Sequence, residues 1–174
     1  MSVLDIIIIP DKRLKHKSSE VLNFDDKLEK IVADMFDTLY HSGNGIGLAA
    51  PQIGISKRIV VIDLKEEGKE NQIVLINPKI IGISEENSIN QEGCLSVPGY
   101  YADVERPNEV NVQWNDLKGK KIKKKCSGLL SICIQHEIDH LDGILFIDYL
   151  SNLKRKRALE KVKKYLKIQN EKIE

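Results

Sequence analysis

The stretch Gln135–Gly143, QHEIDHLDG, decides how this chain of 174 residues is organised. It contains the pattern H-E-x-x-H, in which His136 and His140 are four residues apart. In a helix such residues lie on one face, about one turn from each other, so two imidazoles can reach one metal ion. Glu137 follows the first histidine, where its carboxylate can reach a water molecule at the metal without being a ligand. The pattern predicts metal-dependent hydrolysis.

The helix that carries this pattern is apolar on most of its faces. Ser127 is placed to cap its start and Gly143 to follow its end. A helix that is apolar all round is buried. Burying imidazoles and a carboxylate without partners costs roughly several kcal/mol, and a metal ion is a natural partner for them.

A catalytic metal usually has three protein ligands and keeps one position for water, so a third ligand must come from elsewhere. The downstream candidates are Asp142, Asp148 and Glu160, and upstream Cys94 lies in the segment QEGCLSVPG. A free cysteine taken alone is most often a small buried apolar residue. The residues by themselves therefore leave the third ligand open.

Length and composition favour a single catalytic domain over residues 1–174, with 41% hydrophobic and 30% charged residues, as in ordinary soluble proteins. The apolar opening Val3–Ile9 is too short to span a membrane and has no cleavage site of the secretory kind. Three cysteines without a disulfide spacing suit a reducing compartment. These features exclude the membrane, fibrous and disordered classes.

The remaining periodicities predict helices at the two ends and strands between them. Apolar residues at helical spacing predict an amphipathic helix over Asp25–His41, with Gly43 just beyond its end. Alternating or continuous apolar runs predict an extended Ile6–Ile9 arm and antiparallel strands at 58–64, 72–83, 110–114 and around Ile122. The lysines between 118 and 125 are typical of a solvated edge strand.

The segment Gly43–Gly54, GNGIGLAAPQIG, has glycines that allow a close approach of backbone to a ligand. A phosphate-binding loop is excluded because no Gly-Lys-Ser/Thr follows, although a tight structural turn remains an alternative. Gln52 carries a primary amide in an otherwise small and apolar segment, and such an amide needs a partner when it is buried.

The C-terminal segment 151–174 is basic. Its nine Lys/Arg and three acidic residues give +6, which leaves −5 for the preceding residues because the whole chain carries +1. A helix here would present Leu153, Ala158, Val162 and Leu166 on one side, as a solvated docking helix does.

Three segments together resemble the signature motifs of the peptide deformylase family: GIGLAAPQ at 45–52, EGCLS at 92–96 and QHEIDHLDG at 135–143. They occur in the family's order. IPDKRL at 9–14 and INP at 76–78 extend the resemblance over nearly the whole chain. It implies an α+β fold with antiparallel sheets wrapped around the central H-E-x-x-H helix, plus an N-terminal amphipathic helix and a C-terminal helix.

The resemblance also implies roles for single residues. Cys94, His136 and His140 would bind one metal ion per chain, Fe²⁺ in the family's preference, with Ni²⁺, Co²⁺ or Zn²⁺ as substitutes. Glu137 would be the general base. The Gln52 side-chain amide and the Leu95 backbone N–H would donate hydrogen bonds to the oxyanion.

The substrate implied by the resemblance is an N-formylmethionyl peptide. The residues that would line a slot for the methionine side chain are Ile46, Gly47, Glu92, Leu129, Ile132 and Cys133. The backbones of Ile46 and Gly93 would pair with the peptide as an added strand. Tyr101 stands where many bacterial members have arginine. Arg106 matches a position that pairs with an acid near the metal, here Asp139 or Glu92.

These observations support three hypotheses. The first is a metal-dependent hydrolase that removes the formyl group co-translationally and releases formate, in a bacterial or organelle-like cytoplasm. The second is an H-E-x-x-H metallopeptidase, which would not need the upstream thiolate of Cys94. The third is a ribosome- or RNA-binding module with a structural metal, suggested by the basic segment 151–174. In the enzyme that segment would dock on the ribosome, with no direct nucleic-acid function and no membrane partner.

Overall fold

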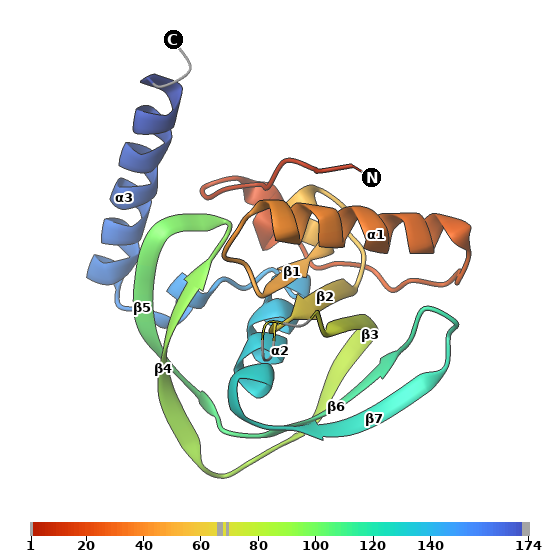
Figure 1. The fold of residues 1–174 in the computed structure, drawn as a ribbon. Coiled ribbons are helices and arrows are strands. Elements are labelled where there is room, and N and C mark those ends of the chain that lie inside the picture. Colours follow the sequence, from red (N-terminus) through yellow and green to blue (C-terminus); the bar gives the residue numbers. More distant parts are fainter. Residues whose placement is uncertain (1, 66–67, 69, 172–174) are drawn as a thin grey trace.

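Two antiparallel sheets surround the helix α2 (Gly128–Leu141) in the computed structural model, which describes residues 2–65, 68 and 70–171. Helix α2 lies at the centre of the molecule, while α1 crosses above the strands and α3 stands apart beside β5 (Figure 1). The predicted α+β class with sheets around the H-E-x-x-H helix is confirmed.

The larger sheet has the strand order β1-β2-β3-β6-β7, and all of its neighbouring strands are antiparallel. Its strands are β1 (Gly47–Ala49), β2 (Ile59–Asp63), β3 (Gln72–Ile83), β6 (Val110–Asn115) and β7 (Lys121–Cys126). The predicted strands correspond to the last four of these, and the lysines of β7 lie on the sheet edge as expected. Charged residues there oppose pairing with another chain.

The smaller sheet is a hairpin of β4 (Asn87–Cys94) and β5 (Val97–Pro107). These two strands were not predicted from the sequence. Strand β4 alternates in burial, but its large apolar residue Ile89 is 69% exposed and most of its other side chains are polar. The hydrophobic signal that reveals a half-buried strand is therefore weak in β4.

Helix α1 (Asp26–His41) and helix α2 bury opposite faces of β2. Asp25 caps α1 by accepting a hydrogen bond from the Leu28 N–H at 3.0 Å, and Gly43 follows the helix with a φ of 79°, so the predicted boundaries are confirmed. Ile59 and Val61 share a core cluster with α1, whereas Val60 and Ile62 share one with α2. Strand β2 is consequently buried on both faces and holds the two helices apart.

Helix α3 (Asn152–Glu171) packs on a third cluster, formed with the N-terminal arm and the β4–β5 hairpin. Ala158 and Val162 are buried there, but Leu153 and Leu166 are 60% and 37% exposed, so these two leucines do not share one side of the helix with Ala158 and Val162 as predicted. At about 100° per residue, Leu153 lies about 140° and Leu166 about 80° from Ala158 around the helix. Residues 172–174 of the predicted segment lie outside the described residues.

Within residues 2–65, 68 and 70–171, no helix is both long and apolar enough to cross a bilayer.

Candidate metal centre and substrate cavity

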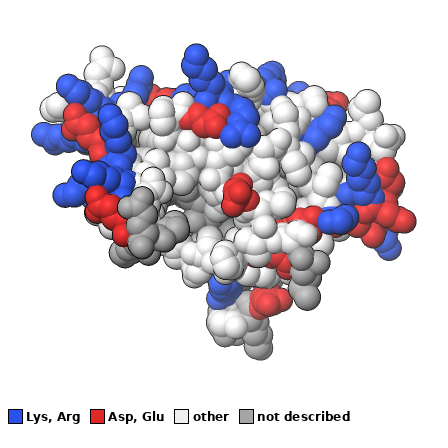
Figure 2. Space-filling view, turned by 90° about the horizontal axis from the view of Figure 1, so that it is seen from above, with Lys and Arg blue, Asp and Glu red and all other residues white. Residues whose placement is uncertain are grey.

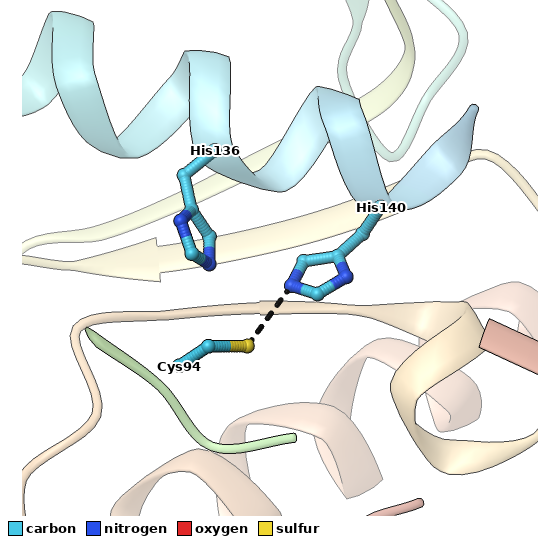
Figure 3. Close-up of side chains that lie close together, drawn as sticks. All are labelled: Cys94, His136 and His140. Carbon is cyan, nitrogen blue, oxygen red and sulfur yellow. Dashed lines mark hydrogen bonds between the residues drawn. The ribbon is translucent and has the colours of Figure 1, made fainter. Parts of the chain in front are cut away.

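Cys94, His136 and His140 come together with their potential ligand atoms within 4.8 Å of one another. Figure 3 shows the two rings descending from α2 toward the thiol, which approaches from the end of β4. The Cys94 Sγ lies 3.2 Å from His140 Nε2. One thiol and two imidazoles are a donor set that suits Zn²⁺, Fe²⁺ and related cations. The residues present therefore fit a bound metal ion.

Of the three downstream candidates for the third ligand, two are engaged elsewhere and the third, Glu160, is exposed on α3. Asp142 accepts a hydrogen bond from the Arg58 Nη1 at 2.8 Å, and Asp148 accepts the Leu145 N–H at 2.9 Å. Among the described residues, the third potential ligand that lies with the two histidines is Cys94.

The end of α2 is set by Gly143, which has a φ of 74°. A β-carbon at this position would overlap the backbone of Lys15, so a glycine both permits the conformation and makes room for the N-terminal segment. Ser127 occupies the N-cap position as predicted, but its side chain forms no capping hydrogen bond with the described part of the helix.

A chain of buried polar groups holds His136. Glu92 Oε2 lies 2.9 Å from His136 Nδ1, and the Glu92 carboxylate also accepts a hydrogen bond from Arg106 Nη2 at 3.0 Å. Arg106 Nη1 donates to Asp139 at 2.9 Å, so this arginine pairs with both acids that the sequence analysis named. Because Nδ1 is engaged by Glu92, Nε2 is the nitrogen left for a metal. Although burial opposes it, hydrogen bonds from His136 and Arg106 hold the pKa of Glu92 below its usual value.

His140 is buried at the last turn of α2. Burial and the neighbouring His136 hold its pKa well below the usual histidine value. The ring is therefore neutral near pH 7, which is the form that binds metal ions. For His136 burial acts in the same direction, but Cys94 and Glu92 outweigh it and raise the pKa.

Glu137 has a buried carboxylate at the cavity wall. Its Oε2 has no hydrogen-bond partner among the described residues, and burial raises its pKa to about 7. Gly47 of β1 passes so close that a β-carbon there would lie 2.7 Å from Oε1 and 2.8 Å from Cys133 Sγ. The glycine thus leaves space beside a carboxylate that is free to act on a bound molecule.

Gln52 is fixed by the 3-10 helix η2 (Ala50–Ile53) and is fully buried. Its Oε1 accepts the Ala49 N–H at 2.9 Å, while its Nε2 donates to Ser96 Oγ at 3.1 Å and lies 3.5 Å from Cys94 Sγ. The partners that the buried amide requires are present, and its N–H groups face the cysteine end of the site.

A cavity of about 620 Å³ lies beside the cluster. The predicted slot and peptide-pairing residues all line it: Ile46, Gly47, Glu92, Gly93, Leu129, Ile132 and Cys133. Leu95, the predicted backbone donor to the oxyanion, lines it as well. Leu129 is 58% exposed, so it lies at the rim and not in the helix core. Tyr101 also lines the cavity, and its ring lies where a side chain on Gly93 would be.

Tyr149 is a residue near the site that sequence reasoning missed. Its hydroxyl donates to Asp139 Oδ2 at 2.9 Å, and its ring centre lies 5.1 Å from the Arg106 guanidinium carbon. Tyr149 therefore helps to hold Arg106 in place, and Arg106 in turn pairs with Glu92, which contacts His136. No local pattern around Tyr149 signals this contact, because it depends on how the chain returns after α2.

Comparisons with known proteins give the same result as the three motifs. A family model described as polypeptide deformylase matches residues 3–156. The chain belongs to this family. The peptide deformylase of Alkalilimnicola ehrlichii is 47% identical over 167 residues, which cover 96% of this chain and 93% of that protein.

Solved structures of the family have the same fold. The peptide deformylase from Legionella pneumophila has a TM-score of 0.92 at 44% identity, covering 97% of this chain and 98% of that one. The enzyme from Ehrlichia chaffeensis in complex with actinonin has a TM-score of 0.90 at 48% identity, covering 95% and 98%. The family consists of metalloenzymes, and the Cys94–His136–His140 cluster is able to hold a metal ion.

Proposed function

We propose that this chain removes the N-formyl group from N-formylmethionyl nascent peptides and releases formate. It is an enzyme of the peptide deformylase family, a hydrolase. The observation that carries the proposal is the buried Glu137 carboxylate, whose Oε2 has no hydrogen-bond partner among the described residues. It lies beside a Cys–His–His cluster at the wall of a 620 Å³ cavity. The actinonin complex of the similar Ehrlichia chaffeensis enzyme supports a cavity that binds small molecules.

Cys94, His136 and His140 would hold the metal. We assign Fe²⁺ as the working ion, with Ni²⁺, Co²⁺ or Zn²⁺ as substitutes, because a thiolate with two imidazoles favours these cations over the oxygen-seeking Mg²⁺ and Ca²⁺. When bound, such an ion acts as a Lewis acid that polarises the formyl carbonyl and activates water at neutral pH. Glu92 and Arg106 keep the His136 ring turned so that Nε2 remains available.

Glu137 moves the proton. Its carboxylate takes a proton from the attacking water, whose oxygen bonds to the formyl carbon, and returns the proton to the nitrogen as the carbon–nitrogen bond breaks. Formate and a free amino terminus result. A pKa of about 7 suits both roles near neutral pH, because the group is neither too weak a base nor too weak an acid.

Gln52 and Leu95 would stabilise the negative charge that develops on the formyl oxygen. The Gln52 amide N–H groups already face the Cys94 end of the site, held there by Ala49 and Ser96. Leu95 directly follows Cys94 at the hairpin turn, and it lines the cavity. Loss of one such donor typically costs about 3–4 kcal/mol of transition-state stabilisation.

The methionine side chain would enter the slot between β1 and α2, where Gly47, Ile132 and Cys133 lie. The pairing of β4 with β5 shifts register between Glu92 and Cys94, so the Gly93 backbone lies outside the regular ladder and is placed to pair with a peptide. The Glu92 carboxylate is occupied by His136 and Arg106, so we assign it mainly to holding His136.

Action on nascent chains would place the enzyme where translation occurs, in a bacterial or organelle-like cytoplasm. Figure 2 shows Lys and Arg side chains gathered with a few acids over α3, at the left of the view. Because polyanions attract such a surface, we include ribosome docking by α3 in the proposal. Loss of ribosome binding after truncation at Ser151 is the expected result, and unchanged binding would remove this part.

The test is formate release from formyl-Met-Ala-Ser by the enzyme loaded anaerobically with Fe²⁺. Formate should appear with the wild type and fall by about 10²–10⁴-fold in Glu137→Ala, the usual contribution of a general base. Metal content should stay at one ion per chain in both proteins. No formate from the iron form, or an undiminished rate in Glu137→Ala, would overturn the proposal. Cleavage of unformylated Met-Ala-Ser would favour a metallopeptidase.

A further inference from the structure

The substrate cavity has a second wall, on the side away from α2, that the proposed reaction does not use. Its apolar and aromatic side chains are contributed by Ile6, Ile8, Pro98, Tyr100 and Tyr165. They come from three segments that are far apart in the sequence: the N-terminal arm, β5 and α3.

The N-terminal arm presents alternate side chains to the core and to the cavity. The Ile7 N–H donates to the Gln52 carbonyl at 2.7 Å, and the Ile9 N–H donates to the Ser96 carbonyl at 3.0 Å. The side chains of Ile7 and Ile9 are buried in the third core cluster. Because successive side chains of an extended segment point in opposite directions, Ile6 and Ile8 face the cavity.

Helix α3 brings Tyr165 to the same wall. Ala158 and Val162 anchor the helix on the core, and Tyr165 follows at the helical spacing that keeps it on their face. The hydroxyl of Tyr100 donates to the Lys154 carbonyl at 3.2 Å and ties the start of α3 to β5. A β-carbon on Gly99 would lie 3.9 Å from Tyr165 Cδ2, so the ring lies beside β5 with room for a methyl group between them.

This wall belongs to the same cavity as the candidate metal centre. A peptide bound at the metal centre would therefore also contact this wall. The cavity volume, about 620 Å³, lies within the range of roughly 300–1,000 Å³ that encloses a drug-sized ligand and exceeds what one residue needs. In an extended peptide, a methionine side chain directed toward α2 sends the next side chain away from α2. Tyr165 lies beyond residues 3–156, the part matched by the family model, so membership does not assign it a role.

We propose that Tyr165, with Ile6 and Ile8, forms a subsite for an apolar or aromatic side chain at the second position of the formylated peptide. Tyr165 is thereby a specificity-determining residue supplied by the C-terminal helix. The inference rests on the proposed function, because it takes formylmethionyl peptides as the substrates.

The experiment compares formyl-Met-Phe-Ser with formyl-Met-Ser-Ser, using the Fe²⁺-loaded full chain. In Tyr165→Ala, kcat/KM for the phenylalanine peptide should fall about three- to tenfold through a higher KM with unchanged kcat, as loss of one aromatic contact predicts. The value for the serine peptide should stay within about twofold. Tyr165→Phe keeps the ring and should behave like the wild type.

Leu166→Ala is the matched control, because Leu166 is the neighbouring residue with 37% exposure against 38% for Tyr165, and it is not part of the described cavity wall. Equal Tm values for the variants would show that α3 stays docked. A third peptide, formyl-Met-Ser-Phe, carries the ring at the third position. An equal loss of kcat/KM for the first two peptides, no loss for either, or a loss confined to formyl-Met-Ser-Phe would overturn the inference.

Failure of the proposed function gives a different result, since the wild type would then release no formate from any of these peptides. Calorimetric binding of the deformylated peptide Met-Phe-Ser makes the comparison independent of turnover. Its Kd should rise about three- to tenfold in Tyr165→Ala and stay unchanged in Leu166→Ala. Equal Kd values in the two variants would contradict the subsite.

Discussion

Helix α2 and the β4–β5 hairpin each supply part of the candidate metal centre, but they position their residues by different means. His136, Glu137 and His140 are set by the helical repeat, so about one turn of backbone fixes them relative to one another. Cys94 lies 42 residues before His136, at the end of β4, and the tertiary packing of the β4–β5 hairpin brings it to the histidines. In the proposed mechanism the helix would provide the proton-transfer group and two ligands, while the hairpin would provide the thiol.

The difference shows where orientation comes from. Within α2 the centres of the two histidine rings are 5.0 Å apart. The geometry of the helix does not determine which ring nitrogen would face a metal ion. That choice is made across the interface, where Glu92 of β4 engages His136 Nδ1 and Arg106 of β5 holds Glu92. A site made by local periodicity thus depends on a non-local partner for its chemistry.

The strongest way to break this comparison is to remove one ligand from each half. Cys94→Ala and His140→Ala should each lower metal affinity by more than about 100-fold, which exceeds the 10–100-fold typical of residues that only support a ligand. Formate release should disappear with the metal. The measurement is metal content by elemental analysis after dialysis, alongside turnover.

Cys126→Ala and His41→Ala are the matched controls, because each removes the same residue type away from the cluster. Both should retain the metal. If Cys94→Ala kept one tightly bound ion per chain and normal turnover, the hairpin would not supply a ligand, and the site would belong to α2 alone.

Gln52 tests the hairpin end of the site without removing a ligand. Gln52→Ala should lower kcat about 10²–10³-fold, the usual cost of losing one oxyanion donor, with metal content unchanged. Ser96→Ala removes the acceptor at 3.1 Å and leaves the amide, so it should have a much smaller effect on kcat. Single-turnover kinetics separate these effects from binding. Equal kcat values for Gln52→Ala and the wild type would exclude this role.

The sequence predicted most of what local periodicity controls. Helix α1 with its Asp25 cap, helix α2 and the antiparallel middle of the chain agree with the structure, because apolar spacing and capping are local properties. The β4–β5 hairpin was missed because Ile89 is exposed and the strand is mostly polar. Cys94 entered through the resemblance and not through spacing. Tyr149 and Tyr165 could not be predicted, since their contacts are set by the tertiary path of the chain.

Arg106 connects the β4–β5 hairpin to helix α2. Arg106→Ala should weaken metal binding about 10–100-fold, because Glu92 would lose the partner that positions it against His136. It should also lower the free energy of unfolding by about 3–5 kcal/mol, the usual cost of breaking a buried ion pair. Metal competition titrations and denaturant unfolding measure the two effects.

Arg58→Ala is the control for Arg106. Arg58 is also largely buried and pairs with Asp142 at 2.8 Å, just past the end of α2. Its loss should lower stability without changing the metal affinity of the folded protein. Unchanged metal affinity and turnover in Arg106→Ala would show that the hairpin contributes its thiol but does not orient His136.

The smallest expected effect concerns Tyr149, which touches both halves through Asp139 and Arg106. Burial and the Asp139 carboxylate raise the pKa of Tyr149 to about 12, above the value of about 10 in an unfolded chain. The folded protein therefore holds the phenol proton more tightly. The resulting stabilisation is complete below pH 10 and is lost as the pH rises toward 12.

In Tyr149→Phe the free energy of unfolding should accordingly fall less steeply with pH between pH 10 and 12 than in the wild type. The difference in slope should correspond to the release of up to about one proton on unfolding. Chelator-treated protein is used, so that the slope reports the contact between helix and hairpin without the metal. Tyr40→Phe is the matched control. The Tyr40 hydroxyl donates a hydrogen bond to Asp63 at 2.6 Å, outside the hairpin, and the pKa of Tyr40 is also about 12. Because the tyrosines share no partner, their effects should add in the double variant. Parallel curves for Tyr149→Phe and the wild type would mean that this contact does not help to join the hairpin to helix α2.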